Sequence, residues 1–186
     1  RDGSLLIKTI KKDEVNTLLR ILPQYCNYMK DNGKRSLLNR IYGIYKVRLK
    51  DGEEEQQHYF VVMNSIFPGE AVDRISERFD LKGSTLGRKA SEEDKLRLAS
   101  KVVLKDLDLA EEIESKRVSD GRVICLGTHA KAAVMKQLRQ DVAMLRRCSV
   151  IDYSLLVGIA PVESNVPRRR RIARSIRSFL APKLYD

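Results

Sequence analysis

The sequence contains, at residues 151–158, the stretch Ile151-Asp152-Tyr153-Ser154-Leu155-Leu156-Val157-Gly158. Its apolar and aromatic residues are typical of a strand, and we expect that strand to span residues 150–159. The carboxylate of Asp152 interrupts the apolar run. Burying a carboxylate is costly unless it has hydrogen-bonding partners or a chemical role. Asp152 is therefore a candidate general base or hydroxyl-orienting group of an active site, and a hydrogen-bonded core aspartate is the alternative.

A second unusual stretch brings different chemical groups together within five residues: Asp80-Leu81-Lys82-Gly83-Ser84. Its glycine permits backbone conformations that other residues disfavour. A carboxylate, an ammonium and a hydroxyl at this spacing can hold a phosphate or position another charged group. An ion pair that leads into a turn would use the same residues. From the residues alone, the two interpretations are equally good.

Lys8 lies in a short apolar run, residues 4–10, that is typical of a strand. Because side chains alternate along a strand, Lys8 points away from the face of Ile7 and Thr9. Glu14 follows six residues later, at the start of an expected helix. A strand lysine held by a helix carboxylate is the arrangement of a phosphate-binding lysine. The alternatives are a solvated lysine and a carboxylate favoured by the helix dipole.

The remaining pattern predicts an α+β protein. We expect Asp13 to cap a helix that bends or stops at Pro23, and then a turn at residues 31–33. A hairpin with its turn at residues 51–52 follows, then a loop over residues 64–69 and an extended segment over 77–82. The segments 91–94 and 111–117 are polar and expected at the surface. The best helix covers residues 131–147, with Met135, Leu138, Val142 and Leu145 on one face.

Composition narrows the possible partners. The 186 residues suffice for one domain, and their net charge of +11 favours anionic partners such as phosphates, acidic lipids or nucleic acid. Aromatic residues make up only 6%, without Trp, which argues against an RNA-binding protein. No apolar stretch approaches the ~20 residues that span a bilayer. The spacing of the cysteines and histidines predicts no metal site and no disulfide framework.

Taken together, the motifs resemble those of the phosphatidylinositol phosphate kinase family. The two stretches at residues 80–84 and 151–158 look like its hallmark motifs. Four further segments are similar to family segments in the family's order: Leu6-Ile7-Lys8-Thr9-Ile10, Tyr59-Phe60-Val61-Val62-Met63-Asn64, Leu104-Lys105-Asp106-Leu107-Asp108-Leu109 and Gln140-Asp141-Val142-Ala143-Met144-Leu145. The resemblance covers residues 4–159.

This resemblance implies a two-lobed, protein-kinase-like lipid kinase core that uses ATP and Mg²⁺. Its implied site residues fall into two groups. Lys8, with Glu14 as its partner, would hold the nucleotide phosphates, and the adenine would lie near Met63 and Asn64, the joint between the lobes. Asp152 would orient or deprotonate the inositol hydroxyl, and Asp80 and Lys82 would line the active site. We assign no metal ligand.

The resemblance also implies a phosphatidylinositol phosphate substrate and an anionic membrane surface as partners, at the cytoplasmic face of the plasma membrane. Nucleic acid is not an expected partner, and the oligomeric state stays open. The segment Lys105-Asp106-Leu107-Asp108 favours a kinase that phosphorylates the 5-hydroxyl of phosphatidylinositol 4-phosphate over a 4-kinase. The alternative function is a non-catalytic phosphoinositide-binding module of the same fold.

This interpretation divides the chain into two parts. Residues 1–160 would form a partial catalytic domain, incomplete at both ends, because the family's Gly-rich loop, second metal-binding aspartate and activation loop are not recognisable. Residues 161–186 would form a basic tail, with six arginines among residues 167–177. We expect a disordered tail that contacts lipid. An amphipathic helix with Ile172, Ile176, Phe179 and Leu180 on one face and a nuclear-localisation or nucleic-acid patch are the alternatives.

Overall fold

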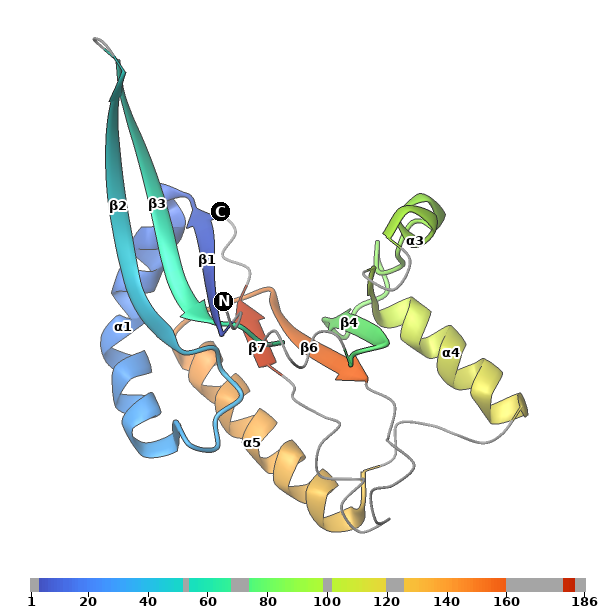
Figure 1. Ribbon diagram of the computed structural model, residues 1–186. Coiled ribbons are helices and arrows are strands. Elements are labelled where there is room, and N and C mark those ends of the chain that lie inside the picture. The colour runs from blue at the N-terminus through green and yellow to red at the C-terminus, as the bar shows by residue number, and fades with distance from the viewer. Residues whose placement is uncertain are drawn as a thin grey trace.

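The computed structural model describes residues 4–51, 54–67, 74–98, 102–119, 126–159 and 179–182. Within these ranges the chain contains two β-sheets and several helices (Figure 1). The predicted α+β class is confirmed. None of the described helices combines the length and the apolar character that crossing a bilayer requires.

The first sheet has three antiparallel strands in the order β1-β3-β2. These strands are β1 (Leu5–Ile10), β2 (Ile41–Asp51) and β3 (Glu54–Asn64). The predicted hairpin is confirmed as the long β2–β3 ribbon in Figure 1. Of the turn predicted at residues 51–52, Asp51 is the last residue of β2 and residue 52 lies outside the described residues, as does the expected loop beyond residue 67. In β1, Lys8 is paired with Val61 of β3.

The first helix, α1 (Lys12–Asn32), corrects two expectations. Lys11 occupies the position before its first turn, whereas Asp13 lies inside that turn together with Glu14. The helix does not stop at Pro23 but continues past it. A proline removes one helical hydrogen bond, but Leu18, Ile21 and Tyr25 on both sides of it are buried. Burial of this helix face keeps the helix continuous to Asn32.

The second sheet has four strands in the order β5-β4-β6-β7. They are β4 (Glu77–Leu81), β5 (Val103–Leu104), β6 (Tyr153–Ile159) and β7 (Phe179–Pro182). Strand β7 departs at residues 179–182 from the expected disordered tail, and it contradicts the alternative of an amphipathic helix at Phe179 and Leu180, because both residues pair with β6. The open edge of β6 supplies backbone partners that an isolated tail would lack. The arginine-rich residues before residue 179 lie outside the described ranges.

Three more helices complete the described part: α3 (Glu92–Leu98), α4 (Asp106–Ser119) and α5 (Thr128–Arg147). The first two contain the segments that the sequence predicted only as polar surface. The third confirms the predicted helix and most of its apolar face, because Leu145 is buried and Leu138 and Val142 pack against the core. Met135 departs from the prediction, with 41% of its surface exposed. The buried face also includes Gln137 and Asp141, which the apolar spacing did not predict because they are polar.

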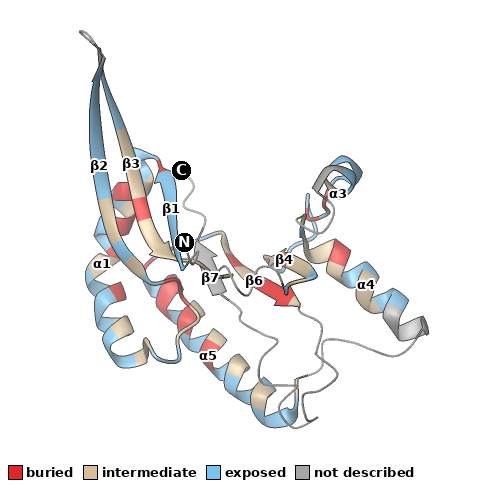
Figure 2. Ribbon diagram, in the orientation of Figure 1, coloured by how far each residue is buried: buried red, intermediate tan, exposed pale blue. Residues whose placement is uncertain are grey.

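One hydrophobic core joins α1, the first sheet and α5 (Figure 2). Ile10, Leu18, Val61 and Leu145 belong to it, and so does Val150 in the loop that follows α5. The core therefore anchors the residues immediately before Asp152.

Candidate active site

Lys82 and Asp152 meet at one edge of the second sheet. Lys82 follows β4 and Asp152 precedes β6, and these antiparallel strands pair Leu81 with Leu155. The register brings the end of one strand next to the start of the other. The Lys82 ammonium and an Asp152 carboxylate oxygen form an ion pair across 70 residues of sequence. The two hallmark motifs are thus one structural unit.

The backbone at Asp152 has an uncommon conformation. The structure places Asp152 in a bend before β6, not inside the strand, and its side chain is 29% exposed, not fully buried. Its φ of 56° and that of Ser149, 54°, lie in the left-handed region. A non-glycine residue held there costs about 1–3 kcal/mol and persists only where its surroundings impose it. The buried side chains of Val150 and Ser154 on either side impose it here.

The loop after α5 is closed by its own backbone. The N–H groups of Ser149 and Val150 donate to the carbonyls of Arg146 (3.0 Å) and Leu145 (3.0 Å). Arg20 from α1 donates to the carbonyl of Cys148 at 3.0 Å. These bonds fix the path of the chain from the end of α5 to Asp152.

Asp80 is turned to a different partner. The Arg88 guanidinium donates to the Asp80 carboxylate at 2.8 Å and also to the Asp80 carbonyl. The same guanidinium donates through Nε to Asp106 at 2.8 Å. Arg88 is buried, with 9% of its surface exposed. For Asp80 the ion-pair interpretation is therefore the one that its contacts support, and Lys82 carries the functional geometry of this motif.

Asp106 holds the turn that presents Lys82. Its carboxylate accepts hydrogen bonds from the backbone N–H groups of Lys82 (3.0 Å) and Gly83 (2.8 Å). Gly83 has a φ of 71°, which glycine adopts without strain. Burial opposes ionisation of Asp106, but the Arg88 hydrogen bond and the two N–H groups outweigh it and lower the pKa of this carboxyl.

Asp108, two residues later, fixes the next part of the same loop. It is buried and accepts hydrogen bonds from the N–H groups of Ala90 (2.9 Å) and Lys105 (3.0 Å), and Lys95 lies 2.9 Å from its other oxygen. Burial again opposes ionisation, but the Ala90 and Lys95 hydrogen bonds outweigh it and lower its pKa. The start of α4 thus holds residues 82–90.

Lys8 and Glu14 come together as the sequence predicted. The Lys8 ammonium on β1 lies 3.8 Å from the Glu14 carboxylate in the first turn of α1, with side chains 48% and 12% exposed. The Lys11 N–H also donates to Glu14 at 2.7 Å. Glu14 is therefore anchored at the helix start, and the half-exposed Lys8 can contact an anion from solvent.

Met63 and Asn64 end strand β3. The Met63 sulfur accepts a hydrogen bond from Asn39 at 3.1 Å, and the Asn64 side-chain oxygen accepts one from the Arg40 N–H at 2.6 Å. These contacts tie the strand end to the segment that leads into β2. Neither residue approaches the Lys82–Asp152 pair among the described contacts.

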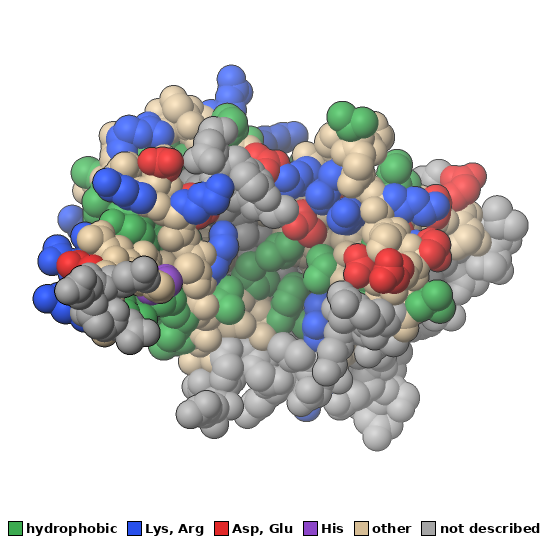
Figure 3. Space-filling view, turned by 90° about the horizontal axis from the view of Figure 1, so that it is seen from above, with side chains coloured by type: hydrophobic (Ala, Val, Ile, Leu, Met, Phe, Trp, Pro, Cys, Tyr) green, Lys and Arg blue, Asp and Glu red, His purple; other side chains and the backbone are tan. Residues whose placement is uncertain are grey.

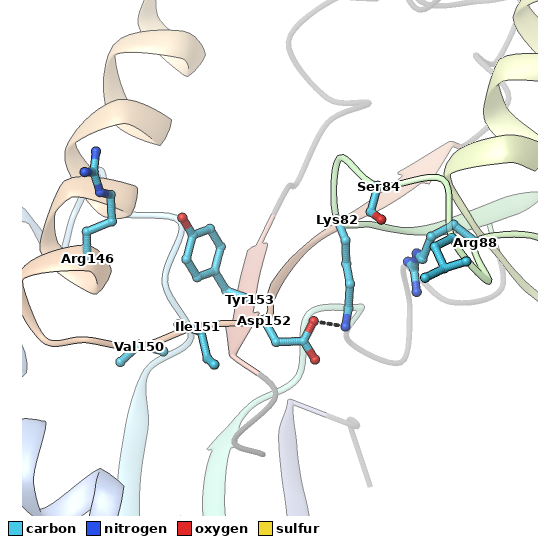
Figure 4. Close-up of a pocket in the computed structure, with 9 residues that line it drawn as sticks. Lys82, Ser84, Arg88, Arg146, Val150, Ile151, Asp152 and Tyr153 are labelled. Carbon is cyan, nitrogen blue, oxygen red and sulfur yellow. Dashed lines mark hydrogen bonds and ion pairs between the residues drawn. The ribbon is translucent and has the colours of Figure 1, made fainter. Parts of the chain in front are cut away.

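A cavity of about 570 Å³ opens beside the Lys82–Asp152 pair (Figure 4). Its lining combines charged, hydroxyl and apolar side chains: Lys82, Ser84, Leu86, Arg88, Arg146, Val150, Ile151, Asp152 and Tyr153. Seen from above, the molecule is hollowed near its centre, with hydrophobic side chains in the hollow and charged side chains on either side (Figure 3). The volume lies in the range of about 300–1,000 Å³ that is typical of small-molecule sites.

The described carboxylates do not fit a magnesium site. Within the described ranges, no group of three or more His, Cys, Asp or Glu side chains is placed to hold a metal ion. Asp152 is engaged by Lys82, and Asp80 and Asp106 are engaged by Arg88. These residues by themselves therefore form no metal centre.

Four residues that matter here were not singled out from the sequence. Asp141 on α5 is fully buried and accepts hydrogen bonds from Tyr28, Ser36, Leu37 and Gln137. Arg88 and Arg146 line the cavity, and Asp106 holds the turn that presents Lys82 to it. The sequence does contain a signal that Asp141 is buried, because this residue falls on the apolar face of a predicted helix. The pairing of Arg88 with Asp106 depends on the sheet topology and has no local signal.

Comparison with known proteins places the chain in a family. The family model described as Phosphatidylinositol-4-phosphate 5-Kinase matches residues 1–180. It therefore includes most of the segment that the sequence set apart as a tail. A probable phosphatidylinositol phosphate kinase of Dictyostelium discoideum is 36% identical over 94% of this chain, which covers 22% of that protein.

Two further relatives are similar to a like degree. Phosphatidylinositol 4-phosphate 5-kinase 7 of Arabidopsis thaliana is 36% identical over 85% of the chain and 18% of the relative. Phosphatidylinositol 4-phosphate 5-kinase-like protein 1 of Mus musculus is 35% identical, over 85% of the chain and 35% of the relative. The chain thus spans a minor part of these proteins. On the family match and these identities, the chain belongs to the phosphatidylinositol-4-phosphate 5-kinase family.

Proposed function

We propose that this chain is the catalytic part of a lipid kinase that transfers the γ-phosphate of ATP to the inositol ring of a phosphatidylinositol phosphate. One observation carries the proposal. Lys82 and Asp152, from the two hallmark motifs, form an ion pair on the wall of a cavity. A carboxylate in a cavity, held in an uncommon backbone conformation and positioned by a lysine, suits a group that must meet a substrate hydroxyl.

In this proposal Asp152 accepts the proton of the inositol hydroxyl while the hydroxyl oxygen bonds to the γ-phosphorus of ATP, and ADP leaves. Lys82 holds the Asp152 carboxylate in place on the cavity wall through their ion pair. Lys8, held by Glu14, binds the nucleotide phosphates as a fixed positive charge. Bound Mg²⁺ would neutralise phosphate charge, and the described residues supply no complete site for it.

The two sheets then correspond to the two lobes of a kinase-like fold. The first sheet with α1 carries Lys8 and Glu14, and the second sheet carries Lys82 and Asp152. The adenine would bind near Met63 and Asn64, at the end of β3. Asp80 acts indirectly, because its partner Arg88 also bridges to the turn at Lys82.

The acceptor that fits best is phosphatidylinositol 4-phosphate, phosphorylated on its 5-hydroxyl. Support comes from the names of the relatives and from the segment Lys105-Asp106-Leu107-Asp108. The net charge of +11 favours peripheral attachment to an anionic membrane. We infer the cytoplasmic face of the plasma membrane as its place of action.

The test is ATP-dependent phosphorylation of vesicles that contain phosphatidylinositol 4-phosphate, with the position of the new phosphate identified by chromatography. Asp152→Asn in the full-length protein should reduce turnover by about two orders of magnitude or more, and Lys8→Met should abolish ATP use. Asp31→Asn and Lys50→Met, at exposed positions away from the cavity, control for the charge changes. Full turnover in Asp152→Asn would refute the catalytic assignment. Vesicle binding without any turnover in the unaltered protein would favour the non-catalytic module.

A further inference from the structure

Phe67 lies just after β3, in the chain that leaves the first sheet. Ile66 beside it is buried, and the Ser65 hydroxyl donates to the Phe67 carbonyl at 3.0 Å. The N–H of Ser65 in turn donates to the carbonyl of Ser4, immediately before β1, at 2.7 Å. These bonds hold Phe67 close to the ends of β1 and β3.

The Phe67 ring lies against Gly158 of β6, in the second sheet. A Cβ atom built on Gly158 would lie 2.7 Å from Cε1 of Phe67 and 3.1 Å from Cδ1 of Ile75. Gly158 is buried, and its φ is not positive. A glycine inside a strand often marks a place where another segment approaches closely. The backbone therefore does not require glycine at this position, and the missing side chain makes room for the Phe67 ring.

Strand β6 is in contact with the first sheet and its surroundings at two places. Near the start of the strand, Tyr153 and Leu155 pack against the core that joins α1, the first sheet and α5. Near its end, Gly158 receives the ring of Phe67. Leu155 and Gly158 are about 10 Å apart along the strand. Two contacts at this separation fix the direction of β6, and with it the place of Asp152, relative to the first sheet.

The two sheets carry the two halves of the proposed chemistry. Lys8 on β1 would hold the nucleotide phosphates, and Asp152, immediately before β6, would meet the acceptor hydroxyl. Phosphate transfer requires both reactants at reacting distance, and a misplacement of about 1 Å can lower the rate about 100-fold. The relative orientation of the sheets is therefore a condition for turnover, although neither Phe67 nor Gly158 lines the cavity.

We propose that the contact between the Phe67 ring and Gly158 sets the orientation of the sheet that carries Asp152 relative to the sheet that carries Lys8. This inference rests on the proposed function, and it makes Phe67 and Gly158 positioning residues for the transfer. A methyl group at residue 158 would lie 2.7 Å from the ring, whereas carbon atoms in unstrained contact are about 3.5–4.0 Å apart. Ring and strand would have to separate by about 1 Å.

The experiment compares Gly158→Ala, Phe67→Leu and the doubly substituted chain in the full-length protein. Gly127→Ala is the matched control, because a Cβ atom at Gly127 meets nothing within 4 Å. Vesicle assays give kcat per folded molecule, and melting temperatures establish that each variant is folded. Calorimetry measures binding of an unreactive ATP analogue and of glycerophosphoinositol 4-phosphate separately. Phe67→Trp, which crowds the same contact from the other side, replaces Gly158→Ala if that variant does not fold.

Gly158→Ala should lower kcat about 10- to 100-fold. The dissociation constants of the two ligands should change little, because each ligand is held by one sheet. Adding Phe67→Leu should restore most of the kcat, because the smaller side chain makes room for the methyl group. Phe67→Leu alone should lower kcat less than Gly158→Ala does, because it removes atoms instead of forcing them apart. Gly127→Ala should match the unaltered protein.

A second measurement does not depend on activity. Spin labels at Lys12→Cys on α1 and Glu114→Cys on α4, both exposed positions, report the distance between the two sides of the molecule once the native cysteines are replaced. Gly158→Ala should change this distance by about 1 Å or more. Adding Phe67→Leu should bring the distance back.

A kcat of Gly158→Ala equal to that of Gly127→Ala would overturn the inference, and so would a loss that Phe67→Leu does not relieve. A lower kcat matched by weaker binding of one ligand would also overturn it, because the damage would then be local to one sheet. An unaltered protein without turnover would refute the proposed function. The label distances would then decide the inference by themselves: a distance that responds to Gly158→Ala and returns with Phe67→Leu supports it, and a constant distance refutes it.

Discussion

Replacing Asp141 should be among the most destabilising single substitutions in the described part of the chain. Its side chain is fully buried in α5. It accepts hydrogen bonds from the hydroxyls of Tyr28 (2.5 Å) and Ser36 (3.0 Å), the N–H of Leu37 (2.8 Å) and the amide of Gln137 (2.9 Å). Burial and the hydrogen bond to Asp141 raise the pKa of Tyr28, so its hydroxyl stays a donor over the ordinary pH range. One carboxylate thus ties α5 to α1 and to the segment before β2.

The loss of unfolding free energy on replacing Asp141 can be estimated from these contacts. Asp141→Ala leaves four donors without an acceptor, and each buried unsatisfied group costs about 1–3 kcal/mol. Water can reach the partly exposed Tyr28 and Ser36, so we expect about 3–5 kcal/mol, less than the sum of four fully buried losses. Asp141→Asn keeps the shape of the side chain, but its NH2 group would face one of the four hydrogen-bond donors. This substitution should lower the free energy of unfolding by about 1–3 kcal/mol. Tyr28→Phe removes a single donor and should cost about 1–2 kcal/mol.

Urea unfolding gives the free energy of unfolding for each variant, and an unchanged slope with urea concentration shows that the comparison is valid. Asp31→Ala, at an exposed position of α1, should fall within about 0.5 kcal/mol of the unaltered chain. The doubly substituted Tyr28→Phe, Asp141→Asn chain should lose less than the sum of the two single losses, because the residues share a hydrogen bond. A loss below about 1 kcal/mol for Asp141→Ala would show that the network contributes little.

Three further outcomes follow from the site. Arg88→Lys keeps the charge but cannot bridge Asp80 and Asp106 with a rigid guanidinium, so thermal unfolding should show a loss of about 1–2 kcal/mol; an unchanged melting temperature would contradict the bridge. The lowered pKa values of Asp106 and Asp108 mean that the native state holds fewer protons than the unfolded state. The contribution of these two carboxylates to stability is complete above the unfolded pKa of about 3.9 and is lost as the pH falls through the lowered native pKa. Asp106→Asn should therefore flatten the dependence of the unfolding free energy on pH below about 4. Equal slopes for the variant and the unaltered chain would contradict the lowered pKa of Asp106. Because Asp152 has a positive φ, Asp152→Ala should melt lower than Asp152→Gly, by about 1 kcal/mol in unfolding free energy, while both lack turnover; the reverse order of melting temperatures would show that the backbone is not strained there.

The local signals in the sequence predicted those elements whose periodicity is undisturbed. The β2–β3 hairpin has β-branched and aromatic residues around an Asp-Gly turn, and β4 reads as extended up to Gly83. Lys8 and Glu14 are close in sequence, so a strand followed by a helix was enough to bring them together. The approach of Lys82 to Asp152 was anticipated only through the family resemblance, because 70 residues separate them.

The features that the sequence did not reveal depend on partners distant in the chain. Pro23 remains inside α1 because the residues around it are buried against other elements, and this burial cannot be read from the helix alone. The residues of β7 are extended because β6 offers them a hydrogen-bonding edge. The partner of Asp80, Arg88, becomes apparent only in the folded chain. In each case tertiary contacts decide between two local conformations or roles.

The charge pairs around the cavity also explain how a small sheet can hold the Asp152 carboxylate at a fixed place on the cavity wall. A loop that carries Lys82 would be free to swing if it were held only by β4. Asp106 accepts hydrogen bonds from two backbone N–H groups of this loop, and Arg88 links Asp106 to the carbonyl and carboxylate of Asp80 in β4. On the other side, the buried core fixes the turn between α5 and Asp152. Both partners of the ion pair are therefore set by contacts that do not involve the substrate, so the energy of substrate binding need not be used to order them.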